Sequence, residues 1–377
     1  MAAQTGRRTF LKWCLYGCTG LAISLYGLNS ILPLKKYWPY TGIESQFYER
    51  LDGKMVLCNL CSHNCLIKSG EQSRCRTRAN IKGVLYSNVY NRPAAVAVEP
   101  VEKEPLYHFL PGSTMLCIGT AGCNFSCKYC QNWLLSQQDT RSLNNIQEQS
   151  SEELIELAAL RKVSAISFTY NEPTVLYEYM LETAEQARIE GLKVVMHSNG
   201  FINPEPLARL LPYLNAVTID LKGFTEDFYQ KVTGGSLNPV LNTLVKLRDN
   251  GIWFEVVNLL IQGLNDDPGD LSQMTYWLYK NLGSVTPLHF SRFFPSYRLA
   301  ELTPTPIETM ERARELAVNS GLKYVNLGNI PGHIFNSTFC PSCATLLVER
   351  NHIAVKNIYI NEGKCPACAE EIPGIWL

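Results

Sequence analysis

The chain has 377 residues, 46% of them hydrophobic and 18% charged, which suits one large folded domain with small attachments and excludes an intrinsically disordered chain. Thirty-four basic residues balance 34 acidic ones, and no lysine or arginine run is present, so we expect no nucleic acid partner. Eleven of the 14 cysteines fall into three groups with metal-ligand spacing, which favours metal-bound thiolates, loaded in a reducing compartment, over a disulfide framework.

The N-terminal segment, residues 1–36, has the pattern of a targeting sequence. Arg7 and Arg8 precede Phe-Leu-Lys, and residues 13–34 carry no charge. Paired arginines before an apolar stretch are typical of a twin-arginine export signal. The 22 uncharged residues are also long enough to cross a membrane as a helix. Export or membrane attachment through residues 13–34 is the favoured interpretation, and a vestigial signal on a cytoplasmic protein remains an alternative.

The next segment, residues 44–110, is predicted to bind a metal. It contains four clustered cysteines in a polar stretch with little apolar material of its own, so a bound metal would explain how it stays ordered. Zinc and a second iron–sulfur cluster both fit the spacing. His63 and His108 are weaker candidate ligands, and Glu102, Lys103 and Glu104 are interpreted as a solvated turn. The four cysteines are Cys58, Cys61, Cys65 and Cys75.

From Ser113 the chain alternates predicted strands and helices, a pattern typical of a parallel sheet covered by helices. We expect an α/β fold with a partial (β/α)6-type TIM-like barrel over residues 111–330. Ser150 and Glu153 form a predicted capping box, and Asn203-Pro204 is a predicted helix start. The predicted strands are 113–120, 163–170, 192–197, 215–222, 252–261, 288–294 and 323–327, and the predicted helices are 150–162, 174–191, 203 onward, 238–249, 269–282 and 306–319.

The first of these strands opens into a loop with three closely spaced cysteines, Cys123, Cys127 and Cys130. Cubane iron–sulfur clusters are normally held by four thiolates, so three indicate a cluster with one iron open to another ligand. A zinc knuckle that lacks a nearby fourth ligand is the alternative. Polar residues follow every predicted strand, and the carboxyl ends of parallel strands share one rim, so the chemistry is expected there. Cys117, within the first strand, is predicted to be a buried core thiol.

The C-terminal element, residues 335–377, carries two Cys-x2-Cys pairs, Cys340 with Cys343 and Cys365 with Cys368, separated by 21 residues. This is the spacing of a zinc ribbon, a closed four-cysteine site that holds a small β element. A rubredoxin-like iron site is the redox alternative.

The cysteine loop, with Tyr129 before the last cysteine, resembles the signature of the radical S-adenosylmethionine (SAM) superfamily. From Cys58 to the C-terminus the chain resembles the radical SAM enzyme of the AmmeMemoRadiSam system, which is related to the pyruvate formate-lyase activating enzymes. The resemblance is carried by the cysteine groups and by residues 105–112, 122–133 and 170–174.

The resemblance implies that Cys123, Cys127 and Cys130 hold a [4Fe-4S] cluster whose fourth iron binds SAM. The superfamily's Gly-Gly-Glu element would correspond to residues 170–172, where both glycines are absent and only Glu172 is carried over. Three further SAM contacts are implied at strand ends, Asn199, Asp220 and Lys222. The implied partners are an electron donor such as a flavodoxin or ferredoxin, and proteins of the Memo and AMMECR families.

Three hypotheses of function follow. The first is a radical SAM enzyme that cleaves SAM to a 5′-deoxyadenosyl radical and abstracts hydrogen from an unidentified substrate. The second is an activase of glycyl-radical enzymes. The third treats the cysteine groups as metal-held structure or electron carriers on a non-enzymatic, membrane-tethered protein.

Overall fold

The structure, a computed structural model, describes residues 42–140 and 147–376. The predicted signal or anchor lies outside these ranges. In the described part, no helix is both long enough and apolar enough to cross a membrane.

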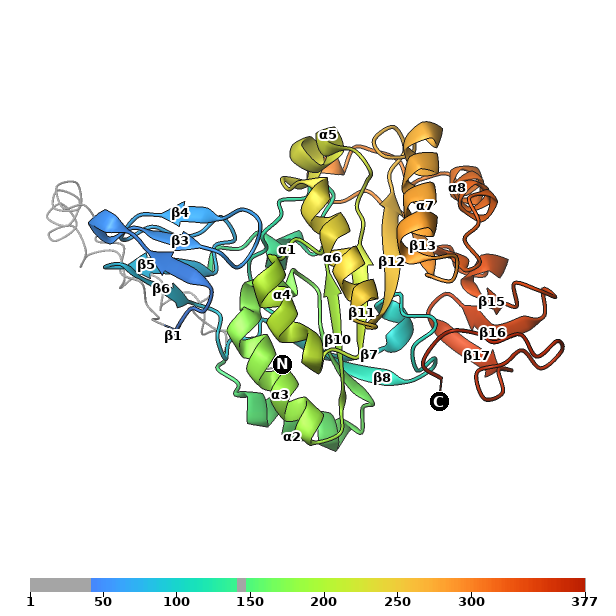
Figure 1. Ribbon diagram of the computed structural model, residues 1–377, viewed down its shortest axis with the longest axis horizontal. Coiled ribbons are helices and arrows are strands. Elements are labelled where there is room, and N and C mark those ends of the chain that lie inside the picture. Colours follow the sequence, from blue (N-terminus) through green and yellow to red (C-terminus); the bar gives the residue numbers. More distant parts are fainter. Residues whose placement is uncertain (1–41, 141–146, 377) are drawn as a thin grey trace, which may run out of the picture. The chain divides into compact units, whose positions relative to one another are not determined.

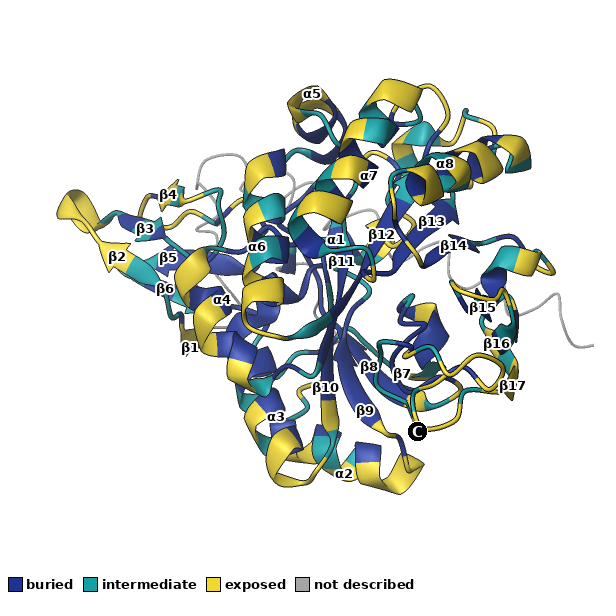
Figure 2. Cartoon of the chain, turned by 45° about the vertical axis from the view of Figure 1, so that its right-hand side comes forward, coloured by how far each residue is buried: buried dark blue, intermediate teal, exposed yellow. Residues whose placement is uncertain are grey.

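A large sheet of eight strands organises the described chain, in the order β14-β13-β12-β11-β10-β9-β8-β7. Strands β8 to β14 are parallel, as the alternating pattern predicted, and β7 runs antiparallel to β8 at one edge. Figure 1 shows helices lying along this sheet, and Figure 2 shows its strands as largely buried. The strands are β7 Ala95–Pro100, β8 Thr114–Gly119, β9 Ala165–Phe168, β10 Lys193–Ser198, β11 Ala216–Asp220, β12 Trp253–Leu260, β13 Leu288–Arg292 and β14 Val325–Gly328.

The helices between these strands begin and end close to the predicted positions. Ser150 accepts a hydrogen bond from the Glu153 N–H and Glu153 accepts one from the Ser150 N–H, so the predicted capping box is confirmed. The α-helices are α1 Trp133–Ser136, α2 Ser151–Arg161, α3 Tyr177–Ile189, α4 Pro204–Leu210, α5 Glu226–Phe228, α6 Leu237–Asp249, α7 Pro268–Leu282 and α8 Ile307–Asn319. Short helical turns are η2 Asp52–Lys54, η3 Val101–Lys103, η5 Pro173–Leu176, η6 Leu211–Tyr213, η7 Tyr229–Thr233, η8 Tyr297–Leu299 and η9 Ile334–Asn336.

Asn203 does not cap α4 through its side chain. Its amide group instead donates to the Asn59 carbonyl oxygen at 2.7 Å and accepts from the Ser62 hydroxyl at 2.9 Å. The residue at the start of α4 therefore ties this helix to the loop that carries Cys61, because a long-range partner competes successfully for the amide.

The predicted solvated turn at Glu102 to Glu104 is wrong. The carboxylates of Glu102 and Glu104 are buried, and only Lys103 reaches solvent. Residues 101–112 connect β7 to β8 along the interior of the large sheet: the Glu104 carbonyl accepts from Thr218 on β11, and the backbone N–H of His108 donates to Glu255 on β12. Burial is possible because each carboxylate has partners inside the fold.

The N-terminal cysteine segment, residues 42–94, forms two small antiparallel sheets. They place Cys58 and Cys65 opposite each other on β3 and β4. Residues 95–110 of the predicted metal segment belong to the large sheet and its β7–β8 connection. The strands are β1 Ile43–Glu44, β2 Tyr48–Arg50, β3 Val56–Cys58, β4 Cys65–Ile67, β5 Arg78–Ile81 and β6 Val84–Ser87.

The C-terminal ribbon, residues 338–376, is a three-stranded antiparallel sheet with two cysteine-bearing turns. Arg350 joins it to the β7–β8 connection: the guanidinium donates to the Tyr107 carbonyl at 2.7 Å and lies 3.5 Å from Glu102. The strands are β15 Thr338–Phe339, β16 Leu346–Asn351 and β17 Ala354–Ile358.

Candidate active site

A single cavity of about 490 Å³ collects side chains from the ends of β8 to β11 and from the inner face of β12 and β13. That volume is typical of small-molecule sites. The sequence placed the candidate chemistry at these strand ends, and the cavity contains all seven predicted active-site residues. They are Cys123, Cys127, Cys130, Glu172, Asn199, Asp220 and Lys222.

The three-cysteine loop follows β8 directly and is held by backbone hydrogen bonds. The N–H groups of Ser126 and Lys128 donate to carbonyl oxygens of η7 at 2.8 and 3.0 Å. Asn171 braces the loop entrance: its amide accepts from the Thr120 N–H at 3.1 Å and donates to the Gly122 carbonyl at 2.6 Å. The backbone of the loop is thereby fixed without using the sulfur atoms.

The loop fits a [4Fe-4S] cluster. No other cysteine lines this cavity in the described part of the chain, so the donor set is three thiolates and leaves one iron for another ligand. In the described residues, these three cysteines do not form a compact group of the kind that holds a single metal ion. Burial raises the pKa of Cys127 to about 11, although the Lys222 ammonium lowers it. Cluster binding must therefore displace protons from these thiols.

Residues 170–172, at the end of β9, are those that the resemblance assigns to the superfamily's Gly-Gly-Glu element. Tyr170 has a φ of 68°, a left-handed conformation that glycine adopts more easily than other residues. The backbone here therefore has a conformation that would suit a glycine. The Tyr170 carbonyl accepts from the Asn132 amide at 2.7 Å, which ties the element to the far end of the cysteine loop.

Glu172 lines the cavity, and its carboxylate is also a structural hub. Oε1 accepts from the Thr174 N–H at 3.0 Å, the Thr174 hydroxyl at 2.6 Å and the Ser198 hydroxyl at 2.8 Å, and Oε2 accepts from the Asn199 N–H at 2.8 Å. Asn199 in turn donates to the Asn124 side chain at 2.8 Å, inside the cysteine loop. These bonds hold the ends of β9 and β10 in register with the loop.

Asp220 and Lys222, at the end of β11, form an ion pair of 2.9 Å, and Asp220 also lies 3.1 Å from Nε2 of His197. Burial alone would raise the pKa of Asp220, but the Lys222 and His197 cations lower it below its usual range. Burial lowers the pKa of His197, but Asp220 and Glu104 raise it to about 10. His197 is therefore an imidazolium at neutral pH.

Glu104 and His197 are cavity residues that the sequence-based site did not include. The Glu104 Oε2 atom lies 2.7 Å from Nδ1 of His197 and accepts from the Thr169 hydroxyl at 2.8 Å. Cys117, the predicted core thiol, is buried and lies 3.4 Å from Glu104. The apolar residues Val101 and Leu106 on either side of the acids were the available signal that this stretch is buried.

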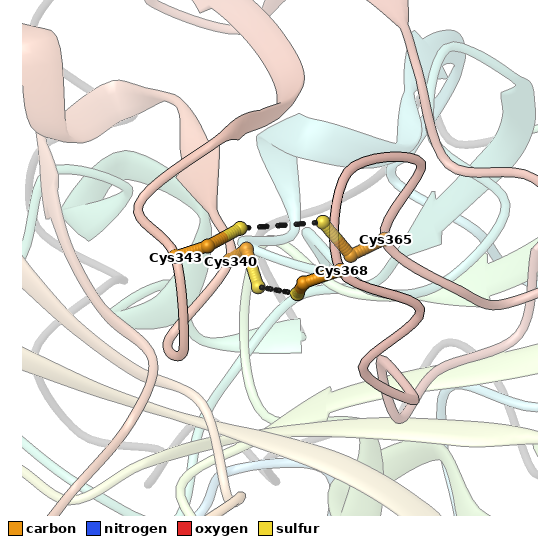
Figure 3. Close-up of side chains that lie close together, drawn as sticks. All are labelled: Cys340, Cys343, Cys365 and Cys368. Carbon is orange, nitrogen blue, oxygen red and sulfur yellow. Dashed lines mark hydrogen bonds between the residues drawn. The ribbon is translucent and has the colours of Figure 1, made fainter.

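The four terminal cysteines meet at one point, as Figure 3 shows. Their sulfur atoms lie within 4.8 Å of one another, with Cys340–Cys368 at 3.5 Å and Cys343–Cys365 at 3.6 Å. Hydrogen bonds with Thr345 lower the pKa of Cys343 to about 6. The four sulfurs thus form one four-cysteine group of the kind that can hold a metal ion.

The N-terminal cysteines surround a separate small cavity, which His63 also lines. His63 Nε2 lies 2.8 Å from the Asn124 carbonyl oxygen. His108 lies elsewhere: it is buried between Trp253, Tyr324 and Trp376, with Nδ1 2.8 Å from the Pro373 carbonyl. His108 is therefore not a ligand of the N-terminal group, because none of the four cysteines is among its neighbours.

A parallel sheet with three cysteines at a cavity rim defines a cluster-dependent enzyme class, and comparison with known proteins agrees. Residues 117–273 match the family described as "Radical SAM superfamily". The uncharacterized protein MJ0808 of Methanocaldococcus jannaschii is 44% identical over 331 residues, which cover 87% of this chain and 98% of that protein. The chain belongs to the radical SAM superfamily, and it is an enzyme that requires an electron donor.

More distant relatives are also enzymes. The pyruvate formate-lyase-activating enzyme of Listeria monocytogenes is 23% identical over 167 residues, which cover 41% of this chain and 64% of that enzyme. GTP 3′,8-cyclase of Aquifex aeolicus is 22% identical over 251 residues, which cover 59% and 75% of the two chains. The solved structure of a domain of a pyruvate-formate lyase-activating enzyme from Bacteroides vulgatus aligns with a TM-score of 0.40 and 13% identity, covering 44% of this chain and 99% of that one.

Proposed function

We propose that the protein reductively cleaves SAM at a [4Fe-4S] cluster held by Cys123, Cys127 and Cys130, within a partial barrel, and uses the product to abstract hydrogen from a substrate. The observation that carries this proposal is the meeting of three sulfurs with the ends of β9, β10 and β11 in one cavity that contains no further cysteine among the described residues. When bound, the cluster and SAM supply a 5′-deoxyadenosyl radical.

The cavity side chains provide matching recognition groups. Lys222 is a cation near the cysteine loop, 6.0 Å from the Tyr129 ring centre, and it would bind an anionic group such as the carboxylate of SAM. The Tyr129 hydroxyl is buried beside the Cys127 thiol, whose pKa it lowers, so it lies next to the proposed cluster site. Glu172 and Asn199 would act at the amino-acid end of SAM, positioned by the hydrogen bonds between them.

Anaerobic reconstitution followed by dithionite and SAM tests the proposal. We expect 5′-deoxyadenosine and methionine, and a change in the spectrum of the reduced cluster when SAM is added. Cys123→Ala should lower 5′-deoxyadenosine formation by about a thousandfold or more. A Cys117→Ala chain is the matched control, because Cys117 is a buried core thiol that does not line the cavity. A well-loaded protein whose spectrum ignores SAM would disprove the proposal.

A glycyl-radical activase is the second candidate, and the similarity to the activating enzyme of Listeria supports it. In that case a backbone glycine of a protein partner would lose the hydrogen. Mass spectrometry of 5′-deoxyadenosine formed with deuterated candidate partners distinguishes this case from a small substrate. The non-enzymatic hypothesis has lost its support, because the family is one of enzymes.

The remaining assignments belong to the same proposal. A flavodoxin or ferredoxin is the expected electron donor, and zinc is the expected metal of the C-terminal ribbon. The resemblance to the AmmeMemoRadiSam system suggests Memo- and AMMECR-family partners.

Export or membrane attachment through residues 13–34 is proposed from the sequence. A fusion of residues 1–40 to a reporter that is active only after export tests this location.

A further inference from the structure

The N-terminal cysteines converge from the β3–β4 hairpin and from the loop before β5. Cys58 ends β3, Cys65 begins β4 directly opposite, and Cys61 lies in the turn between them. Cys75 approaches from the loop before β5, and all four line one small cavity. Cys58 and Cys75 are buried, while Cys61 and Cys65 are partly exposed. The four cysteines therefore line a small cavity of their own, separate from the large one.

The spacing of the sulfur atoms separates this site from the ribbon. A single zinc ion with Zn–S bonds of about 2.3 Å holds four sulfurs about 3.8 Å apart. The ribbon meets this requirement, because its four sulfur atoms all lie within 4.8 Å of one another. In the described residues, it is the one such group of cysteine, histidine or acidic side chains. In the described residues, neither the N-terminal cysteines nor the three-cysteine loop forms such a compact single-ion group. A cubane cluster does not require one, because four iron atoms stand between its thiolates.

A buried donor also indicates a ligand in this cavity. Arg78, which lines it, is fully buried, and its two terminal nitrogens each donate to Glu178 at 2.8 Å. The Nε–H of Arg78 has no partner among the described residues. Native proteins rarely leave a buried charged donor unpaired. Hydroxyl oxygens of Ser73 and Thr77 each lie 3.0 Å from the Cys75 sulfur. These hydroxyls also donate to the carbonyl oxygens of Arg78 and Val175 at 3.3 Å, so the Nε–H of Arg78 is the donor in this cavity that remains for a negatively charged sulfur-rich group.

The two cysteine sites share a wall. A Cβ built on Gly122, the residue before Cys123, would lie 2.5 Å from the Cys75 carbonyl oxygen and 2.6 Å from the Thr77 methyl group. Gly122 also has φ of 85°, so glycine is required there for both reasons. On the other side of Cys123, the Asn124 carbonyl oxygen accepts a hydrogen bond from Nε2 of His63 at 2.8 Å. The backbone on both sides of the first loop cysteine therefore touches the N-terminal site.

We propose that Cys58, Cys61, Cys65 and Cys75 hold a second [4Fe-4S] cluster that passes one electron to the cluster at the three-cysteine loop. A reduced flavodoxin- or ferredoxin-type protein donates the electron to the N-terminal cluster, which returns to its oxidised state when the electron moves on. No bond forms or breaks in this transfer. The relay role depends on the proposed function, whereas the presence of the cluster does not.

The metal content of a chain without the catalytic loop ligands tests the cluster. Cys123→Ala, Cys127→Ala and Cys130→Ala are combined, and the anaerobically purified chain is analysed for iron, sulfide and zinc and by electron paramagnetic resonance after reduction. We expect about four iron and four sulfide per chain, with a reduced-cluster signal. Adding Cys58→Ala and Cys61→Ala should remove this iron, and adding Cys340→Ala and Cys343→Ala should leave it. Zinc at both four-cysteine sites, or a soluble chain without iron, would overturn the proposal.

The relay is tested in the chain with an intact catalytic loop. The Cys58→Ala/Cys61→Ala chain is compared with the unaltered chain, and the iron remaining in each is measured first. Each chain is then reduced either with dithionite or with a reduced flavodoxin. Per loop cluster, the ratio of flavodoxin-driven to dithionite-driven 5′-deoxyadenosine formation should fall about tenfold. An unchanged ratio would show that the N-terminal site supports the loop without carrying electrons. If neither reductant gives product in any chain, the proposed function fails, while the iron analysis still decides the cluster.

Discussion

The N-terminal cysteine segment and the C-terminal ribbon each present four cysteines, but they meet different parts of the active-site cavity. The N-terminal segment touches the three-cysteine loop through Cys75 and Gly122. The ribbon touches the opposite wall, since Arg350 holds the β7–β8 connection that carries Glu104. The two four-cysteine groups therefore differ in what they contact. Those contacts, more than the spacing of the cysteines in the sequence, indicate the role of each group.

Metal removal should separate the two regions most strongly. Structural zinc contributes on the order of 10 kcal/mol to the folding of small zinc domains. The ribbon supplies only Cys340, Leu347, Cys365 and Ile372 to its small buried cluster, so it depends on the metal. Cys365→Ser should abolish hydrogen-exchange protection in residues 338–376 and release about one zinc per chain. Protection in residues 48–87 should be unchanged. Iron in place of zinc at the ribbon would erase the proposed difference between the two groups.

The second difference concerns the buried ion pairs that attach each region. Arg78 and Glu178 form a two-bond pair with both side chains almost inaccessible to solvent, so Glu178→Gln should lower the free energy of unfolding by about 3–5 kcal/mol.

Glu102→Gln at the ribbon contact is the matched control. Arg350 keeps its bonds to Thr338 and Tyr107 there, so we expect a loss of about 1–2 kcal/mol. Chemical denaturation of the metal-loaded chains measures both values. Equal losses would mean that the two regions are attached with equal strength.

Gly122→Ala probes the wall shared by the two cysteine sites. The added methyl group would collide with the Cys75 carbonyl at a residue with positive φ, so we expect about 3 kcal/mol of destabilisation and a loss of iron from both sites. Gly332→Ala, near the ribbon, is the control, because Gly332 has φ of 79° and no atom within 4 Å of the added carbon. It should cost about 1 kcal/mol and leave the iron in place. Iron retained in Gly122→Ala would argue against a shared wall.

The smallest expected effect concerns the titration of His197, which contacts Glu104 in the β7–β8 connection. The pKa of His197 is raised to about 10, so the stabilisation from its charged form is complete below its ordinary pKa of about 6.5 and is lost as pH rises through 10. Nuclear magnetic resonance of the imidazole in the metal-free chain should show a midpoint near this value.

Asp220→Asn should move the His197 midpoint toward 6.5, since Asp220 is the main group that raises it. Glu178→Gln, in the contact of the N-terminal segment, should leave the midpoint in place. An ordinary midpoint in the unaltered chain would contradict the charge pattern described for the cavity.

Local signals in the sequence were sufficient for the elements and the metal groups. The Ser150 capping box formed as predicted because its two partners are three residues apart. The cysteine loop and the seven active-site residues came together because parallel strands place their carboxyl ends at one rim. The helix start at Asn203-Pro204 is also confirmed, but Asn203 does not cap it through its side chain. That side chain and the acids at 102 and 104 were misjudged because their partners lie far away in the chain.

The sequence by itself determined the order of strands and helices, the loop with three thiolates and the four-cysteine ribbon, because each depends on residues close together in the chain. Only the tertiary structure decided that Glu104 enters the cavity beside His197, that β7 closes one edge of the sheet, and that Cys75 lies against Gly122. Burial and long-range hydrogen bonds place these groups, and neither can be obtained from local spacing.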